Sequence, residues 1–372
     1  MKVLHLISSG GMYGAEAVIL NLSRALEQDS HRSILAVFAN STNPNLQLHE
    51  AAQQQGIESH PIACKGQLDR SAIRAIHHLA TQIGADVIHA HGFKADIYAF
   101  LALRKRRIPL VSTCHTWYDT SFLVSFYGKL DRAVLRSYAR VVAVSEEVRQ
   151  RLLKAGVHDS NILKIRNGID LHPFARPIPS PDTAIQPNRE LVVGLVGRLA
   201  WEKGIDILLA AAAKVIPQFP TVRFVIAGEG PDHEALQQTI HSLNLSNQVT
   251  LAGRRNDMPA VYASFDIMVS SSRQEGLPIA ILEGMATGLP LVATAVGEVP
   301  TVVINNTTGL LIPAENPDRL AAAILELLRD PAKRACLGTA ARQLIATDYS
   351  AERMTTEYLH IYEQAIQQVR NK

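Results

Sequence analysis

The sequence predicts an α/β protein made of two doubly wound domains, and three observations lead to this prediction. Strand-like apolar runs alternate with helix-like stretches along all 372 residues, which is typical of parallel sheets with helices on both faces. The strand-like runs number thirteen, too many for one small sheet. Residues 177–187 contain four prolines and predict a stiff connector, so we place one domain at 1–186 and the other at 187–352.

The expected strands follow the order of the chain. In the first half they cover residues 2–8, 32–39, 58–62, 86–90, 109–114, 141–145 and 161–165. In the second half they cover residues 191–197, 222–227, 248–252, 266–270, 289–294 and 308–312. The stretches between them have the mixed polarity of helices that cover a sheet. The last stretch, 350–369, is amphipathic and predicts a final helix.

Composition limits the function classes. The chain is 47% hydrophobic and 19% charged, as in a soluble globular enzyme, and its apolar runs stay well below the roughly 20 residues of a membrane span. Residues 1–7 read as a first strand rather than as a signal peptide. Three distant cysteines, Cys64, Cys114 and Cys336, favour a reducing compartment over a disulfide framework or a zinc site. We therefore expect a cytoplasmic protein.

Glu275 and Glu283 are the most informative pair of side chains. Between them, Gly276 and Pro278 read as a loop and the apolar run that follows reads as a helix. Glu275 is then expected at the carboxyl end of the strand at 266–270 and Glu283 on the helix, at the sheet edge where open α/β proteins bind ligands. Two carboxylates there can accept hydroxyl hydrogen bonds from a sugar and a ribose. A solvated helix with two unrelated glutamates is the alternative.

Two cations lie at the start of the second domain. Arg198 and Lys203 follow the strand at 191–197 and precede a helix at 205–215. A guanidinium, an ammonium and a helix amino terminus together suit a diphosphate, because all three favour negative charge. The glycine-rich turn at 10–14 also lies between a strand and a helix, and it lets a ligand approach backbone amides.

Three familiar nucleotide and metal motifs are missing from the sequence. The dinucleotide fingerprint G-x-G-x-x-G is absent, with residues 228–230 as the nearest approach, and the P-loop is absent too. No Asp-x-Asp occurs, which removes one usual way of holding a divalent metal on a diphosphate. We therefore expect side chains and helix ends to neutralise the diphosphate, with no metal and no cofactor.

Short motifs along nearly the whole chain carry a family resemblance through their order and spacing. They are GGMYGAE (10–16), VIHAHG (87–92), TCHT (113–116), VAVSE (142–146), NGID (167–170), GRLAWEKG (197–204), AGEGP (227–231), EGLPIAILEGMA (275–286), GLPLVAT (288–294) and TGLL (308–311). In these motifs the chain resembles the retaining family-4 glycosyltransferases of the GT-B fold. GEVPT at 297–301 departs from the family's more usual Gly-Gly-x-Pro-Glu.

The resemblance implies a fold and a reaction. The fold has two Rossmann-like domains that face each other across a cleft, an N-terminal one on the acceptor side and a C-terminal one that binds the donor. The final helix, about 353–372, crosses back to the N-terminal domain. The reaction moves a sugar from a nucleotide diphosphate donor, most commonly a UDP-sugar in this family, to an acceptor hydroxyl with the anomeric configuration retained.

The resemblance also assigns roles to single residues. Arg198 and Lys203 hold the diphosphate as leaving group, Glu275 binds hydroxyls of the donor sugar, and His115 contacts the sugar near its reacting face. Glu283 binds the ribose. The other expected donor-binding residues are Gly11, Gly228, Arg254, Gly276, Leu277, Pro278 and Ile279.

The expected partners are a nucleotide sugar and a glycan or lipid-linked acceptor of the cell envelope, such as a polysaccharide or lipopolysaccharide precursor, with no nucleic acid. The net charge of +3 is uneven, with 21 basic and 15 acidic side chains in residues 1–186, so this half suits an anionic partner. The aromatic segment 117–127 is either a helix packed on its own domain or an apolar lip for peripheral contact with the inner membrane face.

Two other functions stay open at this stage. A nucleotide-sugar epimerase of similar architecture would turn over its donor without an acceptor. A non-catalytic nucleotide-sugar binding protein would be expected to lose Glu275, Arg198 or Lys203, and this chain retains all three. His89 and His91 have a spacing that can bind metal, but packing or substrate contact is the preferred interpretation, because the sequence places no third ligand nearby.

Overall fold

The computed structural model describes residues 1–12, 14–41, 44–66, 68–104, 107–115, 130–175 and 190–371. The chain divides into two compact units, Met1–Gly168 with Ala351–Lys372 and Ile169–Ser350. The predicted connector at 177–187 and the aromatic segment at 117–127 lie outside the described residues.

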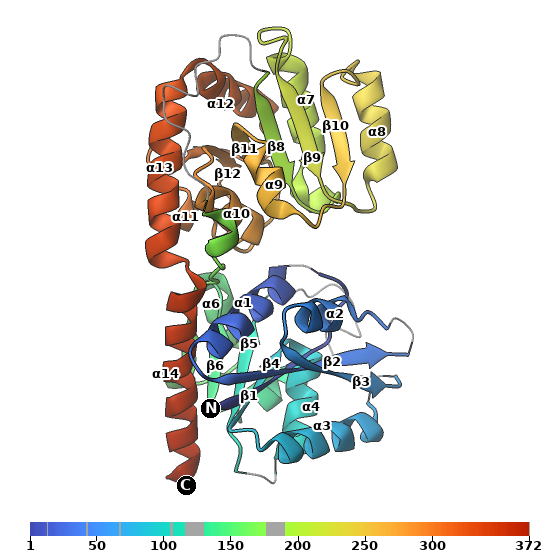
Figure 1. Ribbon diagram of the computed structural model, residues 1–372, viewed down its shortest axis with the longest axis vertical. Coiled ribbons are helices and arrows are strands. Elements are labelled where there is room, and N and C mark those ends of the chain that lie inside the picture. Colours follow the sequence, from blue (N-terminus) through green and yellow to red (C-terminus); the bar gives the residue numbers. More distant parts are fainter. Residues whose placement is uncertain are drawn as a thin grey trace. The chain divides into compact units, whose positions relative to one another are not determined.

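Within the described residues, seven parallel strands form the sheet of the first unit, in the order β3-β2-β1-β4-β5-β6-β7 (Figure 1). The strands are β1 Lys2–Ile7, β2 Arg32–Asn40, β3 Glu58–Cys64, β4 Val87–His91, β5 Leu110–Cys114, β6 Arg140–Ala143 and β7 Ile162–Lys164. They confirm the strands predicted for this half, with ends that differ by one or two residues.

Helices cover both faces of this sheet. They are α1 Gly14–Gln28, α2 Gln47–Gln54, α3 Arg70–Ile83, α4 Phe93–Leu103, α6 Glu146–Lys154 and α14 Ala351–Arg370, with the 3₁₀ turn η1 Asp159–Asn161. Successive side chains of β1 point to opposite faces. Leu4 and Leu6 therefore join the apolar core with α3 and α4, whereas Ile7 joins the core with α1 and α2. The final helix, α14, contacts α1, β4 and β5.

The second unit has a parallel sheet of six strands within the described residues, in the order β10-β9-β8-β11-β12-β13. The strands are β8 Val192–Val196, β9 Arg223–Ala227, β10 Val249–Gly253, β11 Ile267–Ser270, β12 Leu291–Thr294 and β13 Leu310–Ile312. The helices are α7 Ile205–Val215, α8 His233–Ser242, α9 Met258–Ala263, α10 Ile279–Ala286, α11 Val299–Val302, α12 Pro317–Arg329 and α13 Pro331–Asp348, with the 3₁₀ turns η2 His172–Phe174 and η3 Trp201–Lys203. The strands predicted for this half are confirmed, and the prediction of two doubly wound α/β units is correct.

Each sheet has a point where its strand order reverses. In the first unit the chain winds outward from β1 in one direction and from β4 in the other, and in the second unit it does so from β8 and β11. At such a point the loops at the carboxyl ends of the two neighbouring strands diverge and leave room for a ligand. These loops contain Gly11 after β1, Lys203 after β8 and Glu275 after β11. The topology therefore places three predicted site residues at switch points.

The first segment of the first unit ends at Gly168, whereas the prolines suggested a domain boundary at 186/187. The Ile169 amide donates to the Tyr349 carbonyl at 2.9 Å, and Ile169 pairs with Ser350 in a short parallel bridge. Phe174 packs edge-on against Tyr262, with 5.9 Å between ring centroids. Residues 169–175 thus belong to the second unit by their contacts. Composition marks a linker but does not reveal such contacts with distant residues.

Candidate functional site

Lys203 and Glu275 form the centre of the candidate site in the second unit. The 3₁₀ turn η3 carries Lys203 past the end of β8, and the loop after β11 carries Glu275. The Lys203 ammonium lies 2.5 Å from Glu275 Oε1. The Lys203 side chain is 22% exposed and the Glu275 side chain 9%, so the pair is better shielded from water than a surface ion pair.

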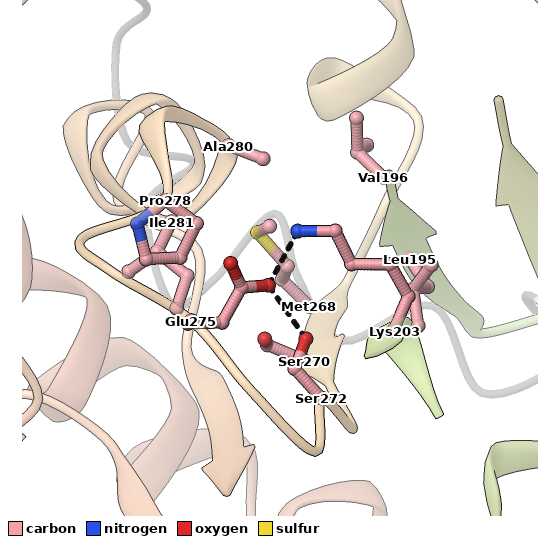
Figure 2. Close-up of a pocket in the computed structure, with 10 residues that line it drawn as sticks. All are labelled: Leu195, Val196, Lys203, Met268, Ser270, Ser272, Glu275, Pro278, Ala280 and Ile281. Atoms are coloured by element: carbon pink, nitrogen blue, oxygen red, sulfur yellow. Dashed lines mark hydrogen bonds and ion pairs between the residues drawn. The ribbon is translucent and has the colours of Figure 1, made fainter. Parts of the chain in front are cut away.

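This ion pair borders a small cavity, shown in Figure 2. Ser272 Oγ donates to Glu275 Oε1 at 2.7 Å, so one carboxylate oxygen receives both donors. Among the described residues both contacts go to Oε1, and Oε2 can accept a hydrogen bond from a ligand. The ammonium of Lys203 has three N–H donors and uses one on Glu275. The other residues that line the cavity are Leu195, Val196, Met268, Ser270, Pro278, Ala280 and Ile281.

Arg273 holds the turn that carries Lys203. Its guanidinium makes two hydrogen bonds to the Asp206 carboxylate, at 2.9 and 2.7 Å, and one to the Trp201 carbonyl at 2.9 Å. It also reaches Glu315 at 2.9 Å and lies over the Trp201 ring at 5.1 Å from the centroid. The Arg273 side chain is only 12% exposed. Bidentate guanidinium–carboxylate pairs fix geometry as well as charge, so this contact ties residues 201–206 to the loop that bears Glu275.

Arg198 lies in the turn after β8, and its side chain is half exposed. Its nearest ion-pair partner is Glu202, at 3.9 Å. A pair this long and exposed contributes little stability and leaves the guanidinium available to an anion. Gly228, predicted to bind the donor, has a structural role beside this turn. At a φ of +152°, a Cβ there would lie 1.8 Å from the Gly197 carbonyl oxygen.

The loop of residues 276–278 leads from Glu275 into α10. Pro278 is the N-cap residue, and the helix begins at Ile279. Gly297 supports the loop from the next strand's connection. A Cβ at Gly297 would meet the Glu275 carbonyl at 1.8 Å, and φ there is +52°, so only glycine fits. Donor binding by Gly276, Leu277, Pro278 and Ile279 stays a prediction.

Glu283 lies on α10, on the helix as predicted. Tyr262 on α9 donates its hydroxyl to Glu283 Oε2 at 2.7 Å. Burial raises the pKa of Glu283 to about 7, although the Tyr262 hydrogen bond opposes this rise. Close to neutral pH, Glu283 is therefore a mixture of carboxylate and carboxylic acid, and a ligand with two hydroxyl donors would favour the ionised form.

His115 and Gly11 lie in the first unit, at the carboxyl edge of its sheet. His115 directly follows β5, and its Nε2 lies 3.2 Å from Nδ1 of His91. Burial lowers the pKa of His115 to about 4, so the ring is neutral near pH 7. The Gly11 amide donates to Ser9 Oγ at 3.2 Å. A phosphate at the predicted position would therefore compete with Ser9 for that amide.

Arg254 follows β10 and is exposed, two strands away from β8 in the sheet of the second unit. It lies at the same carboxyl edge as Lys203 and Glu275 but outside the cavity that these two residues border. The structure thus brings together Lys203, Glu275 and Pro278, and it places Arg198, Arg254 and Glu283 farther along the same edge.

Among the described residues, one group has metal-ligand geometry, and it lies in the first unit. Ligand atoms of His5, His89 and His91 come within 4.8 Å of one another, and all three side chains are buried. Both nitrogens of His89 already contact hydroxyl groups, at 2.7 Å each. Within the described residues, His91 also contacts protein groups through both nitrogens, and His5 does so through Nδ1 alone. The expectation of a metal-free transfer site in the second unit stays a prediction.

Two family profiles match the chain in sequence. The profile described as Glycosyltransferase Family 4 matches residues 12–172, and the profile described as Glycosyl transferases group 1 matches residues 182–344. Together they account for most of both units.

The chain is a family-4-like glycosyltransferase of the GT-B fold.

Individual relatives agree with this assignment. The glycosyltransferase is 26% identical to the phosphatidyl-myo-inositol mannosyltransferase of Mycolicibacterium smegmatis, over 94% of its own chain and 90% of that relative. It is 28% identical to the UDP-Gal:alpha-D-GlcNAc-diphosphoundecaprenol alpha-1,3-galactosyltransferase of Escherichia coli, over 70% and 71% of the two chains. Anabaena Alr3699/HepE, solved in complex with UDP, superposes with a TM-score of 0.83 at 23% identity, over 97% of this chain and 99% of that one. The same protein was also solved with UDP-glucose.

None of the described helices of this glycosyltransferase is long and apolar enough to cross a lipid bilayer.

Sequence reasoning missed several residues that shape the site. Ser272 and Arg273 stand in what reads as an ordinary loop, and Tyr262 reads as a core aromatic. Arg273 meets Asp206 through the strand order of the sheet, which makes β8 and β11 neighbours. Ser272 lies three residues from Glu275 in the same loop, and Tyr262 lies on the helix before β11. The serine run at 270–272 after a strand was the one available signal, since hydroxyls at a strand's carboxyl end often contact ligands or site residues.

Proposed function

We propose that this glycosyltransferase moves a sugar from a UDP-sugar to a hydroxyl of a glycan or lipid-linked acceptor of the cell envelope, with retention of the anomeric configuration and without a divalent metal. We place it in the cytoplasm, with peripheral contact at the inner membrane face. The observation that carries the proposal is the shielded pair of Lys203 and Glu275 at the carboxyl ends of β8 and β11.

The pair supplies both kinds of group that a nucleotide sugar needs. Lys203 keeps two N–H donors for a diphosphate, and the half-exposed Arg198 adds a second cation. Glu275 Oε2 can accept a sugar hydroxyl. In the transfer, the bond between the anomeric carbon and the diphosphate oxygen breaks, and negative charge grows on that oxygen. Lys203 and Arg198 stabilise this charge, while the acceptor oxygen bonds to the anomeric carbon and passes its proton to the departing diphosphate.

The relatives support the choice of donor and acceptor. Alr3699/HepE binds UDP and UDP-glucose, and the galactosyltransferase of Escherichia coli is named for a UDP-Gal donor and a diphosphoundecaprenol-linked acceptor. The mannosyltransferase of Mycolicibacterium smegmatis is named for a phosphatidylinositol acceptor. Two of these names describe a lipid-linked acceptor, which is the class we propose for this chain.

The charges at the site support the proposal of a metal-free mechanism. Metal-dependent transferases commonly use a carboxylate pair to hold a cation on the diphosphate, and the sequence has no Asp-x-Asp. Lys203 and Arg198 provide positive charge at the place where the leaving group would form. Transfer in excess chelator is expected to proceed at an unchanged rate, and full loss of transfer that Mg²⁺ or Mn²⁺ restores would contradict this mechanism.

The test begins with the donor. Thermal unfolding of the full chain is measured against a panel of UDP-, GDP- and ADP-sugars, because a donor at a hundred times its Kd raises the unfolding free energy by about 2.7 kcal/mol. The stabilising donor is then incubated with lipid-linked and free glycans, and the linkage of the product is read by NMR. Binding without any turnover would identify a binding protein, and isomerised donor without acceptor would identify an epimerase.

A further inference from the structure

Three histidines of the first unit form a hydrogen-bonded chain that ends at His115. His5 on β1 places its Nδ1 3.1 Å from Nε2 of His91, at the end of β4. His91 in turn places its Nδ1 3.2 Å from Nε2 of His115. Neighbouring rings lie 5.4 Å apart with interplanar angles of 21° and 26°. Nearly parallel ring planes with centroids at this separation are compatible with these nitrogen-to-nitrogen hydrogen bonds.

The chain runs from the middle of the sheet to its carboxyl edge. His5 is fully buried and His91 is 5% exposed, whereas His115 is only partly buried. His89 lies beside the chain but is not part of it. Its two nitrogens contact the Tyr362 hydroxyl and Thr113 Oγ1, and its ring lies 4.0 Å from that of His91.

Three neutral imidazoles carry only one N–H each, and this limits the hydrogen bonds of the histidine chain to two arrangements. A neutral imidazole carries one N–H and one acceptor nitrogen. His91 must therefore donate to one neighbour and accept from the other. In the first arrangement His5 donates to His91, His91 donates to His115, and the remaining N–H is on Nδ1 of His115. In the second, every bond is reversed and the remaining N–H is on Nε2 of His5.

The surroundings of His5 distinguish the two arrangements. Its Nε2 is buried and has no hydrogen-bond partner among the residues that the structure describes. The second arrangement would leave a buried N–H donor unsatisfied there. The first leaves only a lone pair. We favour it by analogy with the protein backbone, in which orphaned buried N–H groups are rarer than under-satisfied carbonyl oxygens.

We propose that His5 and His91 are positioning residues that hold His115 in the Nδ1–H tautomer, so that the active site receives a neutral N–H donor and not a base. This proposal rests on the proposed function only in assigning His115 to the sugar donor. The Nδ1–H would donate to an oxygen of the bound nucleotide sugar. The nitrogen that carries this proton would be fixed by His5, which lies inside the sheet and two hydrogen bonds away from His115.

Burial keeps the chain neutral, as the proton count requires. It lowers the pKa of His5 to about 3 and that of His115 to about 4. The pKa of His91 also lies well below its usual value, because of burial first and the neighbouring histidines second. All three rings are therefore uncharged near pH 7.

The direct test is to determine the tautomer of His115 in the protein without a bound ligand. The protein is labelled with ¹⁵N-histidine, and long-range ¹H–¹⁵N spectra distinguish Nδ1–H from Nε2–H in each ring. Variants that each lack one histidine assign the signals. The expected result is Nδ1–H for His5, His91 and His115. An Nε2–H tautomer at His115 would overturn the proposal whether or not the chain transfers sugar.

Two variants of His5 test the coupling. His5→Leu removes the first donor, so His91 can place its proton on Nε2 and His115 should lose part of its Nδ1–H population. His5→Asn retains an amide donor near the position of Nδ1 and should preserve the wild-type tautomer. His89→Leu is the matched control, because His89 is as buried as His5 but lies outside the chain. It should leave the His115 tautomer unchanged.

Kinetics with UDP-glucose, or with the donor that the panel identifies, supply the second measurement. His5→Leu should lower kcat by about five- to tenfold with little change in KM, and His5→Asn should restore most of it. Under the proposal, His5→Leu should fold at least as well as the parent, because leucine suits an apolar strand. If His5 had only a structural role, His5→Leu would instead lower stability and activity together. Unchanged His115 signals in His5→Leu, or metal bound to the histidines of the purified chain, would each contradict the proposal.

Discussion

Glu275 and Glu283 have the same side chain, but their surroundings separate their roles. An ammonium and a hydroxyl both donate to one carboxylate oxygen of Glu275, which leaves the other oxygen for a ligand. Glu283 receives one hydrogen bond from a phenol, and burial raises its pKa to about 7 against the effect of that hydrogen bond. The first glutamate is thus ready to accept a sugar hydroxyl, whereas the second gains most from a ligand that donates two hydroxyls.

Replacing each glutamate by glutamine should separate recognition of the donor sugar from recognition of UDP. Glu275→Gln should lower sugar transfer sharply while UDP still binds, because UDP carries no sugar. Glu283→Gln should weaken UDP itself by about ten- to a hundredfold, the cost of one hydrogen bond to a charged group. Calorimetric titration with UDP measures both. Equal UDP affinity in the two variants, or loss of UDP binding in Glu275→Gln alone, would show that these roles are assigned wrongly.

The raised pKa of Glu283 predicts that UDP affinity depends on pH. Below pH 7 the side chain is mostly protonated and accepts ribose hydroxyls poorly, and above pH 7 it is mostly a carboxylate. UDP should therefore bind about tenfold more tightly at pH 8 than at pH 6, in proportion to the ionised fraction. Titration of Glu283→Gln over the same range corrects for the titration of UDP. Parallel pH profiles for the two proteins would exclude Glu283 as the titrating group.

At the scale of elements, the predictable part of this molecule is local. Each strand is a short apolar run, and Lys203 and Glu275 each follow such a run. Their positions at strand ends could therefore be predicted. Their contact could not be, because β8 and β11 are neighbours only through the strand order of the sheet. The same reason hides the line from His5 to His115, which crosses β1, β4 and β5.

Arg273 shows how one loop supports another across that sheet. It joins the turn at 201–206 to the loop after β11, so its loss should leave Lys203 less well placed. Arg273→Gln is expected to lower UDP affinity by about tenfold with a smaller loss of stability, because one charged hydrogen bond is worth about that much. Arg255→Gln breaks an exposed pair with Asp257 and serves as the control. A matching loss of affinity in both variants would contradict a specific role for Arg273.

At the scale of the whole molecule, each unit has its own core, and the first unit contains an unusual feature in its core. Asp96 on α4 and Asp131 are both buried, beside Cys114 and Tyr138. Burial, and the neighbouring Asp131 carboxyl, raise the pKa of Asp96 well above its usual value. Burial raises the pKa of Asp131 to about 7. In the part of the chain that the structure describes, Asp96 Oδ1 and Oδ2 and Asp131 Oδ1 are buried without a hydrogen-bond partner, which is unusual for buried carboxyl groups.

The two acids make stability fall as pH rises. Unfolded aspartates titrate near pH 4, whereas folded Asp131 has a pKa of about 7 and the pKa of folded Asp96 lies well above its usual value. Between those values the folded chain binds more protons than the unfolded chain. The contribution of each acid is therefore complete below pH 4 and is lost as pH rises through the folded pKa.

Asp96→Asn tests this directly. The amide is neutral at every pH, and Asp131 no longer has an acidic neighbour, so the variant should lose less stability than the parent between pH 5 and pH 8. The expected difference in that loss is about 1–3 kcal/mol, since one unit of pKa shift corresponds to 1.36 kcal/mol. Urea unfolding at each pH measures it, and the slope against pH separates titration from any change in packing that asparagine causes. If Asp96→Asn and the parent lose stability in parallel from pH 5 to pH 8, Asp96 does not titrate in this range, and another group must account for the pH dependence.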